Sequence, residues 1–226
     1  MIFGVNSAIP INKRLKNGYT LYDWIMRQKG FPEFCMRTLG GECKLTDNEI
    51  DFLRNKRCKI ALVFRELTEV GVSGTSGVSD AERAVKAVRE TSVPEEQGIA
   101  IFADIRPHWS VNHNWMISFA AYIESSGYIP GFIGNTDSSL NFNFDRQCSH
   151  FIQATRDVNN FGTVYCATEP KLDSTPKDWS PYCPSALEPE DIHLWMNGTT
   201  TFDSIFTDDV YARNEDILNY FWEGET

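Results

Sequence analysis

The hydrophobic positions of this 226-residue chain fall into short unbroken apolar runs, separated by amphipathic segments. The clearest run covers residues 98–105 and has the sequence GIAIFADI. It does not alternate between apolar and polar side chains, which indicates a strand buried on both faces that ends at Asp104. Similar runs predict further strands over residues 2–8, 33–39, 59–65, 128–134, 163–168, 191–196 and 202–206.

Segments with helical periodicity lie between most of these runs. Thr46 is placed to cap a helix that runs to about residue 55, and Glu49 three positions later completes a capping box. Residues 80–90 carry alanine and valine on one helical face. The other segments expected to be helical are 19–28, 115–125, 148–156 and 217–222, and the expected loops are the glycine-rich 71–77 and the proline-rich 170–190.

Strands that alternate with helical segments of about ten residues are typical of a parallel sheet built from βα units. Seven or eight such strands favour a closed barrel over an open doubly wound sheet. We therefore predict an α/β fold, an irregular (β/α)8 TIM-type barrel with short or missing helices in its second half. Residues 1–226 are expected to form one domain. Pro130 argues against a regular central ladder in the 128–134 strand.

Composition excludes several classes of protein. The chain is 42% hydrophobic and 13% aromatic, as in globular proteins, and its net charge of −10 argues against a nucleic acid partner. No apolar run approaches the roughly 18–20 residues that span a bilayer. The N-terminus begins directly with strand-like sequence and carries no signal peptide. This leaves open the alternative that a leader was removed from the chain. The sequon at residues 197–199 leans toward an exported protein.

The six cysteines leave two interpretations open. There is no C-x-x-C pair, so a structural zinc site is not expected. Cys58 and Cys166 lie in or beside apolar runs, as small buried hydrophobic residues do. Cys43, Cys148 and Cys183 lie in polar segments, where disulfides are plausible if the protein is exported.

Side chains at the carboxyl ends of barrel strands converge on one face. Carboxylates paired across a cleft suit acid–base cleavage of a glycosidic bond, aromatic rings stack on sugars, and arginines bind anionic groups. The candidates at or just beyond these ends are Asn6, Arg37, Arg65, Glu66, Asp104, Arg106, His108, Trp109, Asn135, Glu169, Trp195, Asn197, Asp208 and Asp209.

Simpler roles compete with this interpretation. Asp104 could cap the following helix or pair with Arg106, and Arg37 could form an ion pair with Glu66 inside the barrel mouth. The motifs of other enzyme classes are missing. There is no histidine pair of a zinc hydrolase, no G-x-S-x-G elbow and no G-x-G-x-x-G turn, so neither a metal nor another cofactor is expected.

A series of motifs covers nearly the whole chain: Gly4-Val5-Asn6, residues 34–39 with Arg37, Leu45-Thr46 with Glu49-Ile50, Asp80-Ala81, Ile101-Phe102-Ala103-Asp104, residues 128–135, Leu194-Trp195 and Asp209-Val210. In order and spacing, these motifs resemble the DUF1906 family of glycoside-hydrolase-like domains, typified by the Rv2525c-like domain. The resemblance implies a barrel related in fold to the family 25 lysozymes.

The chain departs from the family 25 lysozymes at two positions. Those enzymes have an aspartate on strand one and a glutamate acid two residues after the strand-four aspartate, where this chain has Asn6 and Arg106. Neither residue can supply a proton, so another carboxyl must act as the acid. We expect Glu66 in that role, with Asp104 as nucleophile, base or electrostatic stabiliser, and with Asp209 and Glu169 as second choices.

Two functions follow. The first is hydrolysis of a glycosidic bond in a cell-wall or other polysaccharide, such as peptidoglycan, which needs two carboxyls about 5–9.5 Å apart in one cleft. The alternative is a non-catalytic barrel that binds a glycan. In either case the residues expected to bind the glycan are Asn6, Arg37, Arg65, Arg106, Trp109, Asn135, Glu169 and Trp195.

Overall fold

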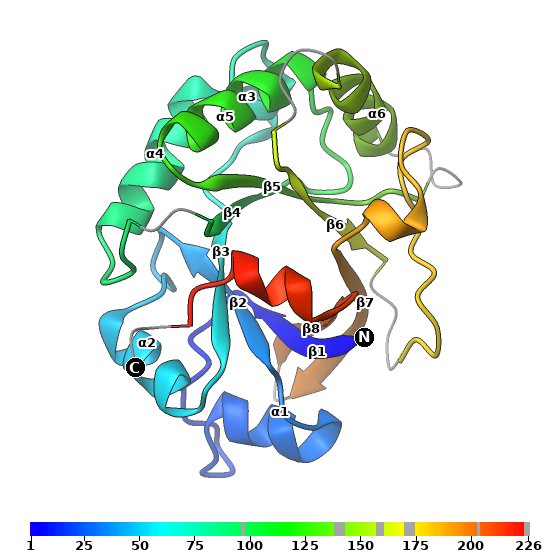
Figure 1. Ribbon diagram of the computed structural model, residues 1–226. Helices are drawn as coiled ribbons and strands as arrows, with labels where there is room; N and C mark the ends of the chain where they lie inside the picture. The colour runs from blue at the N-terminus through cyan, green and yellow to red at the C-terminus, as the bar shows by residue number, and fades with distance from the viewer. Residues whose placement is uncertain (96–97, 138–142, 157–160, 170–174, 203, 224–226) are drawn as a thin grey trace.

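The computed structural model describes residues 1–95, 98–137, 143–156, 161–169, 175–202 and 204–223. Its centre is a closed barrel in which eight strands pair in chain order (Figure 1). The strands are β1 (Ile2–Ser7), β2 (Phe34–Leu39), β3 (Lys59–Phe64), β4 (Ala100–Asp104), β5 (Ile129–Gly134), β6 (Val164–Thr168), β7 (Leu194–Phe202) and β8 (Ile205–Ala212).

Successive strands from β1 to β7 pair in parallel, but β8 runs antiparallel to both of its neighbours, β7 and β1. The expectation of two short final strands over residues 191–196 and 202–206 was therefore wrong, because β7 and β8 form a long hairpin. The connection between Phe202 and Ile205 is too short for a crossover, which needs a dozen or more residues, so the returning strand must be antiparallel.

Helices surround mainly the first six strands (Figure 1). They are α1 (Leu21–Lys29), α2 (Asp47–Asn55), α3 (Glu69–Ser73), α4 (Val78–Arg89), α5 (His113–Ser125) and α6 (Asn143–Thr155). In the described residues after α6, the only helical elements are the 3-10 turns η2 (Pro189–Asp191) and η3 (Glu215–Tyr220). The predicted irregular barrel with missing helices in its second half is thus confirmed.

Local differences from the predicted elements have local causes. Helix α3 overlaps the loop expected over 71–77, because the Thr68 hydroxyl accepts a hydrogen bond from the Gly71 N–H at 3.1 Å and caps a short turn. Pro130 lies within β5 without ending it, since it is only the second residue of that strand. Part of the loop expected over 170–190, residues 170–174, lies outside the described residues.

Large and small residues complement each other inside the barrel. A Cβ on Gly4 would lie 2.5 Å from the Phe34 ring, and a Cβ on Gly131 would lie 2.5 Å from the Phe102 ring. Each phenylalanine ring therefore fills the space that is left because the paired residue on the neighbouring strand is a glycine and has no side chain. The result is a packed apolar interior toward the amino-terminal end of the barrel.

The chain's own C-terminal segment closes the amino-terminal end of the barrel. Phe221 packs with ring centroids 5.0 Å from Phe34 and 6.4 Å from Phe102. Trp222 forms a bridge with Ile60, which lies at the start of β3. Figure 1 shows this red segment crossing the barrel opening. The opposite end, where strands β1 to β7 finish, is where polar side chains gather.

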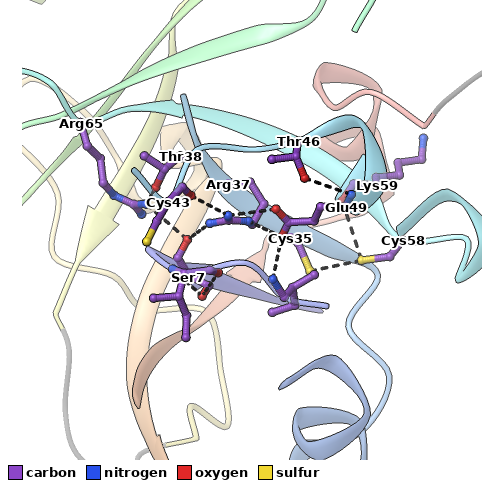
Figure 2. Close-up of polar contacts among 12 residues, drawn as sticks. Ser7, Cys35, Arg37, Thr38, Cys43, Thr46, Glu49, Cys58, Lys59 and Arg65 are labelled. Carbon is purple, nitrogen blue, oxygen red and sulfur yellow. Dashed lines mark hydrogen bonds and ion pairs between the residues drawn. The ribbon is translucent and has the colours of Figure 1, made fainter. Parts of the chain in front are cut away.

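A buried ion pair ties α2 to the barrel (Figure 2). Arg37 on β2 donates to both carboxylate oxygens of Glu49, at 2.6 and 3.0 Å, and both side chains have 0% exposure. Thr46 caps α2 as predicted, accepting from the Glu49 N–H. The expected capping box was wrong, because the Glu49 carboxylate accepts instead from Arg37 and from the Ile11 N–H at 2.6 Å.

Replacing Glu49 by glutamine is expected to lower the free energy of unfolding by about 3–5 kcal/mol, because it leaves the Arg37 charge buried without its counter-charge. Urea unfolding of purified protein measures this difference. Asp51→Asn, an exposed change on the same helix, is the control and is expected to cost less than about 0.5 kcal/mol. Equal losses in the two variants would contradict the role given to this ion pair.

Candidate active site

Polar side chains line the inside of the barrel at the carboxyl ends of its strands. Successive side chains of a strand point to opposite faces, so a residue two positions beyond an interior apolar residue also points inward. The interior apolar residues Met36, Val63, Phe102, Ile133 and Cys166 define that face. The inward positions that follow, together with those on β1 and β8, are Asn6, Thr38, Arg65, Asp104, Asn135, Thr168 and Asp208.

Arg65 is the centre of a hydrogen-bonded network in this layer. Its Nε donates to Asp104 Oδ2 at 2.9 Å, and its two terminal nitrogens donate to the Asn6 amide oxygen and the Thr38 hydroxyl. Asn6 Nδ2 in turn donates to Asp208 Oδ2 at 2.9 Å. Two carboxyls, Asp104 and Asp208, therefore belong to one network, joined through Arg65 and Asn6.

The two carboxyls have different environments. The Asp104 side chain is 28% exposed and forms an ion pair with Arg65. Burial raises the pKa of Asp208, and the nearby charge of Asp104 adds to that rise. Hydrogen bonds from Asn6 and Thr199 and the charge of Arg65 lower this pKa, without cancelling the effect of burial. Asp208 therefore holds its proton to a higher pH than an ordinary aspartate does.

Glu66 lies apart from this network. Its side chain is exposed and lines a pocket of about 300 Å³ beside Gly40, Lys44 and Arg83. A Cβ on Gly40 would lie 2.6 Å from the Glu66 carboxyl carbon, which places that carboxyl against the loop after β2. The structure thus does not bring Glu66 into the layer of inward residues that holds Asp104.

Asp209 and Arg37 lie outside the barrel interior. Asp209 is fully buried, forms an ion pair with Lys29 of α1 at 3.0 Å and accepts from the Thr200 hydroxyl. Arg37 pairs with Glu49, so the alternative of an Arg37–Glu66 ion pair was wrong. With no exposed surface, Arg37 acts as a structural residue in this conformation.

Other predicted residues lie around the rim. The exposed Arg106 has its guanidinium 5.4 Å from the Trp109 ring centroid, so it stacks on Trp109. The alternative that Asp104 pairs with Arg106 is replaced by the Arg65 ion pair. Asn135 is buried, and its side-chain oxygen accepts from the Asp137 N–H at 2.9 Å, which shapes the turn after β5.

Glu169 and Trp195 come together in a pocket of about 530 Å³ beside β6 and β7. Tyr182 lines the same pocket. Its N–H donates to the Glu169 carboxylate at 2.7 Å, and its carbonyl accepts from the Thr136 hydroxyl just after β5. The loop that carries Tyr182 is therefore held against the carboxyl ends of two neighbouring strands, with the Tyr182 side chain 49% exposed.

Sequence reasoning gave too little weight to two residues. Asp208 was among the strand-end candidates, but Asp209 was preferred as a catalytic residue. The signal that separates the two is the alternation of side chains along β8 between the inside and the outside of the barrel. Asp208 pairs with Asn6 across the strands and shares its inward face. Tyr182 was missed, because it stands in a proline-rich loop whose course the sequence pattern does not indicate.

Neither a metal site nor a membrane span was found within the described ranges. No group of three His, Cys, Asp or Glu side chains there is placed to hold a metal ion. No helix among these residues is long and apolar enough to cross a bilayer.

Comparison with known proteins finds no matching family model and no matching curated sequence, but it finds solved structures of the same fold. An uncharacterized B. stearothermophilus protein has a TM-score of 0.77 at 18% identity, over 98% of this chain and 100% of that one. The Mycobacterium tuberculosis Tat-secreted protein Rv2525c has a TM-score of 0.61 at 14% identity, over 95% and 96%. The bacterial lysozyme from Streptomyces coelicolor has a TM-score of 0.59 at 9% identity, over 97% and 96%.

The chain shares its barrel fold with these structures. The fold implied by the sequence resemblance, shared with Rv2525c and with lysozymes, is thereby confirmed. At these identities the likeness concerns the fold. The roles of individual side chains are therefore argued from the geometry of this chain alone.

The raised pKa of Asp208 predicts a pH-dependent stability effect. The folded protein binds this proton more tightly than the unfolded chain, so the stabilisation is present at low pH and is lost as pH rises through the raised pKa. Asp208→Asn removes the buried charge and is expected to raise the Tm at pH 7. Below the ordinary aspartate pKa of about 4 the gain is expected to vanish.

Thermal unfolding of the wild type and of the variant at both pH values measures this difference. Asp216→Asn, an exposed change in η3, is the control and is expected to leave the Tm unchanged at either pH. A Tm at pH 7 that is lower in Asp208→Asn than in the wild type would show that Asp208 is charged and well paired in the folded state.

Proposed function

We propose that this protein hydrolyses a glycosidic bond in a polysaccharide, with Asp208 as the general acid and Asp104 as its carboxylate partner. The observation that supports the proposal is the network in which Arg65 and Asn6 join these two carboxyls at the carboxyl ends of the barrel strands. Glycoside hydrolysis needs one protonated and one ionised carboxyl that face the same bond.

The environments of the two carboxyls suit different roles. Asp208 is buried with a raised pKa, as a proton donor requires. Its Oδ2 accepts from Asn6 at 2.9 Å, and its Oδ1 accepts a longer hydrogen bond of 3.4 Å from the Thr199 hydroxyl. Asp104 is partly exposed and ion-paired with Arg65, so its carboxylate can stabilise the positive charge that develops on the sugar ring.

The rim provides surfaces for the glycan. Tyr182 is exposed, its backbone N–H and carbonyl are held by Glu169 and Thr136, and aromatic rings of this kind stack on sugars. Arg106, stacked on Trp109, adds an exposed cation for an anionic substituent. The fold shared with a bacterial lysozyme favours a cell-wall polysaccharide as the substrate class.

Asp208→Asn and Asp104→Asn are each expected to lower kcat on the cleaved polysaccharide by about 100-fold or more, since each removes one acid–base or charge-stabilising group. Release of reducing ends from peptidoglycan, chitin and glucans measures turnover. In the wild type, activity is expected to fall as pH rises through the raised pKa of Asp208, because the acid must be protonated.

Glu66→Gln is the control for this assignment, because Glu66 was the acid expected from sequence and lies outside the network. It is expected to retain wild-type turnover. Full turnover by Asp104→Asn, or a loss in Glu66→Gln equal to that in Asp208→Asn, would refute the assignment.

A second candidate function is glycan binding without cleavage. The positions that carry acidic residues in family 25 lysozymes hold Asn6 and Arg106, and the Arg65 ion pair lowers the nucleophilicity expected of Asp104. A barrel of this kind would bind a glycan at its aromatic rim and release no product.

Tyr182→Ala is expected to weaken binding to an insoluble glycan about 5- to 100-fold, because it removes an exposed ring at the rim. Sedimentation of the protein with peptidoglycan or chitin measures the bound fraction. Tyr19→Ala removes another exposed tyrosine, which is far from Tyr182 in the sequence. It is the control and is expected to bind normally. Unchanged binding by both variants would contradict a role for this rim in glycan binding.

The same experiments distinguish the two functions. Hydrolysis predicts product release that depends on Asp104 and Asp208. Binding alone predicts affinity that depends on Tyr182, with no product from the wild-type protein after prolonged incubation.

A further inference from the structure

Two buried cysteines meet where β2 and β3 begin. Cys35 lies on β2 and Cys58 lies immediately before β3, and their Sγ atoms are 3.4 Å apart (Figure 2). Both side chains are buried, with exposures of 0% and 2%. The backbones on either side are held in register, since Phe34 pairs with Lys59 and Cys35 pairs with Ile60.

We propose that Cys35 and Cys58 form a structural disulfide when the protein folds under oxidising conditions. A disulfide has an S–S distance of about 2.0 Å, so small rotations of the two side chains bring the sulfur atoms from contact to bonding distance. The strands β2 and β3, which these cysteines belong to or adjoin, are already neighbours in the barrel.

The other four cysteines are placed differently. Cys148 and Cys166 are buried on separate elements, while Cys43 is exposed and the Cys183 thiol donates to the Leu187 carbonyl. The expectation that disulfides involve Cys43, Cys148 and Cys183 thus has no support in the geometry. Of the six cysteines, all of which the structure describes, Cys35 and Cys58 are the pair whose sulfur atoms are in contact.

The bond forms by thiol–disulfide exchange. One thiolate attacks a small disulfide such as oxidised glutathione and displaces one glutathione thiolate, and the second cysteine then displaces the other. Two S–H bonds break, one S–S bond forms, and the two electrons and two protons end on two molecules of reduced glutathione. Burial raises the pKa of the Cys58 thiol, so the reaction takes place before this region is closed.

The disulfide would close a loop that contains α2. The two cysteines are 23 positions apart, and the segment between them includes both Arg37 and Glu49. A cross-link over this length restricts the unfolded chain and is expected to raise the Tm of the oxidised protein by about 5–10 °C. The covalent bond and the ion pair would then hold the same segment of the barrel.

The test is to reduce and denature the full chain, refold it with reduced and oxidised glutathione, and alkylate the remaining thiols in denaturant. Intact mass then counts the alkylated cysteines, and a non-reducing peptide map identifies any linked pair. The wild type is expected to show four alkylated cysteines and a Cys35–Cys58 link. A parallel sample refolded with excess reductant is expected to show six and to unfold at lower temperature.

Matched variants separate the pair from the remaining cysteines. Cys35→Ser and Cys58→Ser are each expected to show five alkylated cysteines and no difference in Tm between oxidised and reduced samples. Cys148→Ser, which removes a buried cysteine elsewhere, is expected to keep the link and show three. Six alkylated cysteines in the oxidised wild type, or a link between any other two cysteines, would overturn the proposal.

Discussion

The buried ion pair between Arg37 and Glu49 is the constraint on which this end of the barrel depends. Arg37 also donates to the Ser7 carbonyl at the end of β1 and to the Cys43 carbonyl after β2, while Glu49 accepts from the Ile11 N–H. A charge with no access to water is stable only when all of these partners are in place. The pair therefore fixes the end of β1 relative to β2 and α2.

The candidate active site is built on that fixed frame. The Ser7 carbonyl accepts from Arg65 as well as from Arg37, so the structural arginine and the arginine of the site share one backbone group. Asn6, the residue before Ser7, is held where it can accept from Arg65 and donate to Asp208. In our proposal Asn6 orients Asp208 on the neighbouring strand β8, and Asp208 acts as the acid.

Alternation along single strands decides which candidates share the site. Asp208 points into the barrel while the next residue, Asp209, points out to Lys29. In the same way Arg65 reaches Asp104, whereas Glu66 turns away to the loop at Gly40. A shift of one position moves a side chain to the other face of the sheet, so neighbours of similar chemistry have unrelated surroundings.

By itself, the sequence determined the order of the elements, the barrel class and Asp104 at the end of its strand, because apolar runs and helix caps are local patterns. It also placed Asn6, Arg65 and Asp208 among the strand ends. Only the tertiary structure decided that β8 returns antiparallel, that Glu49 belongs to Arg37, and that Asp208 rather than Glu66 or Asp209 shares a network with Asp104. Those outcomes depend on strand register and on contacts between residues up to 202 positions apart, which no local pattern encodes.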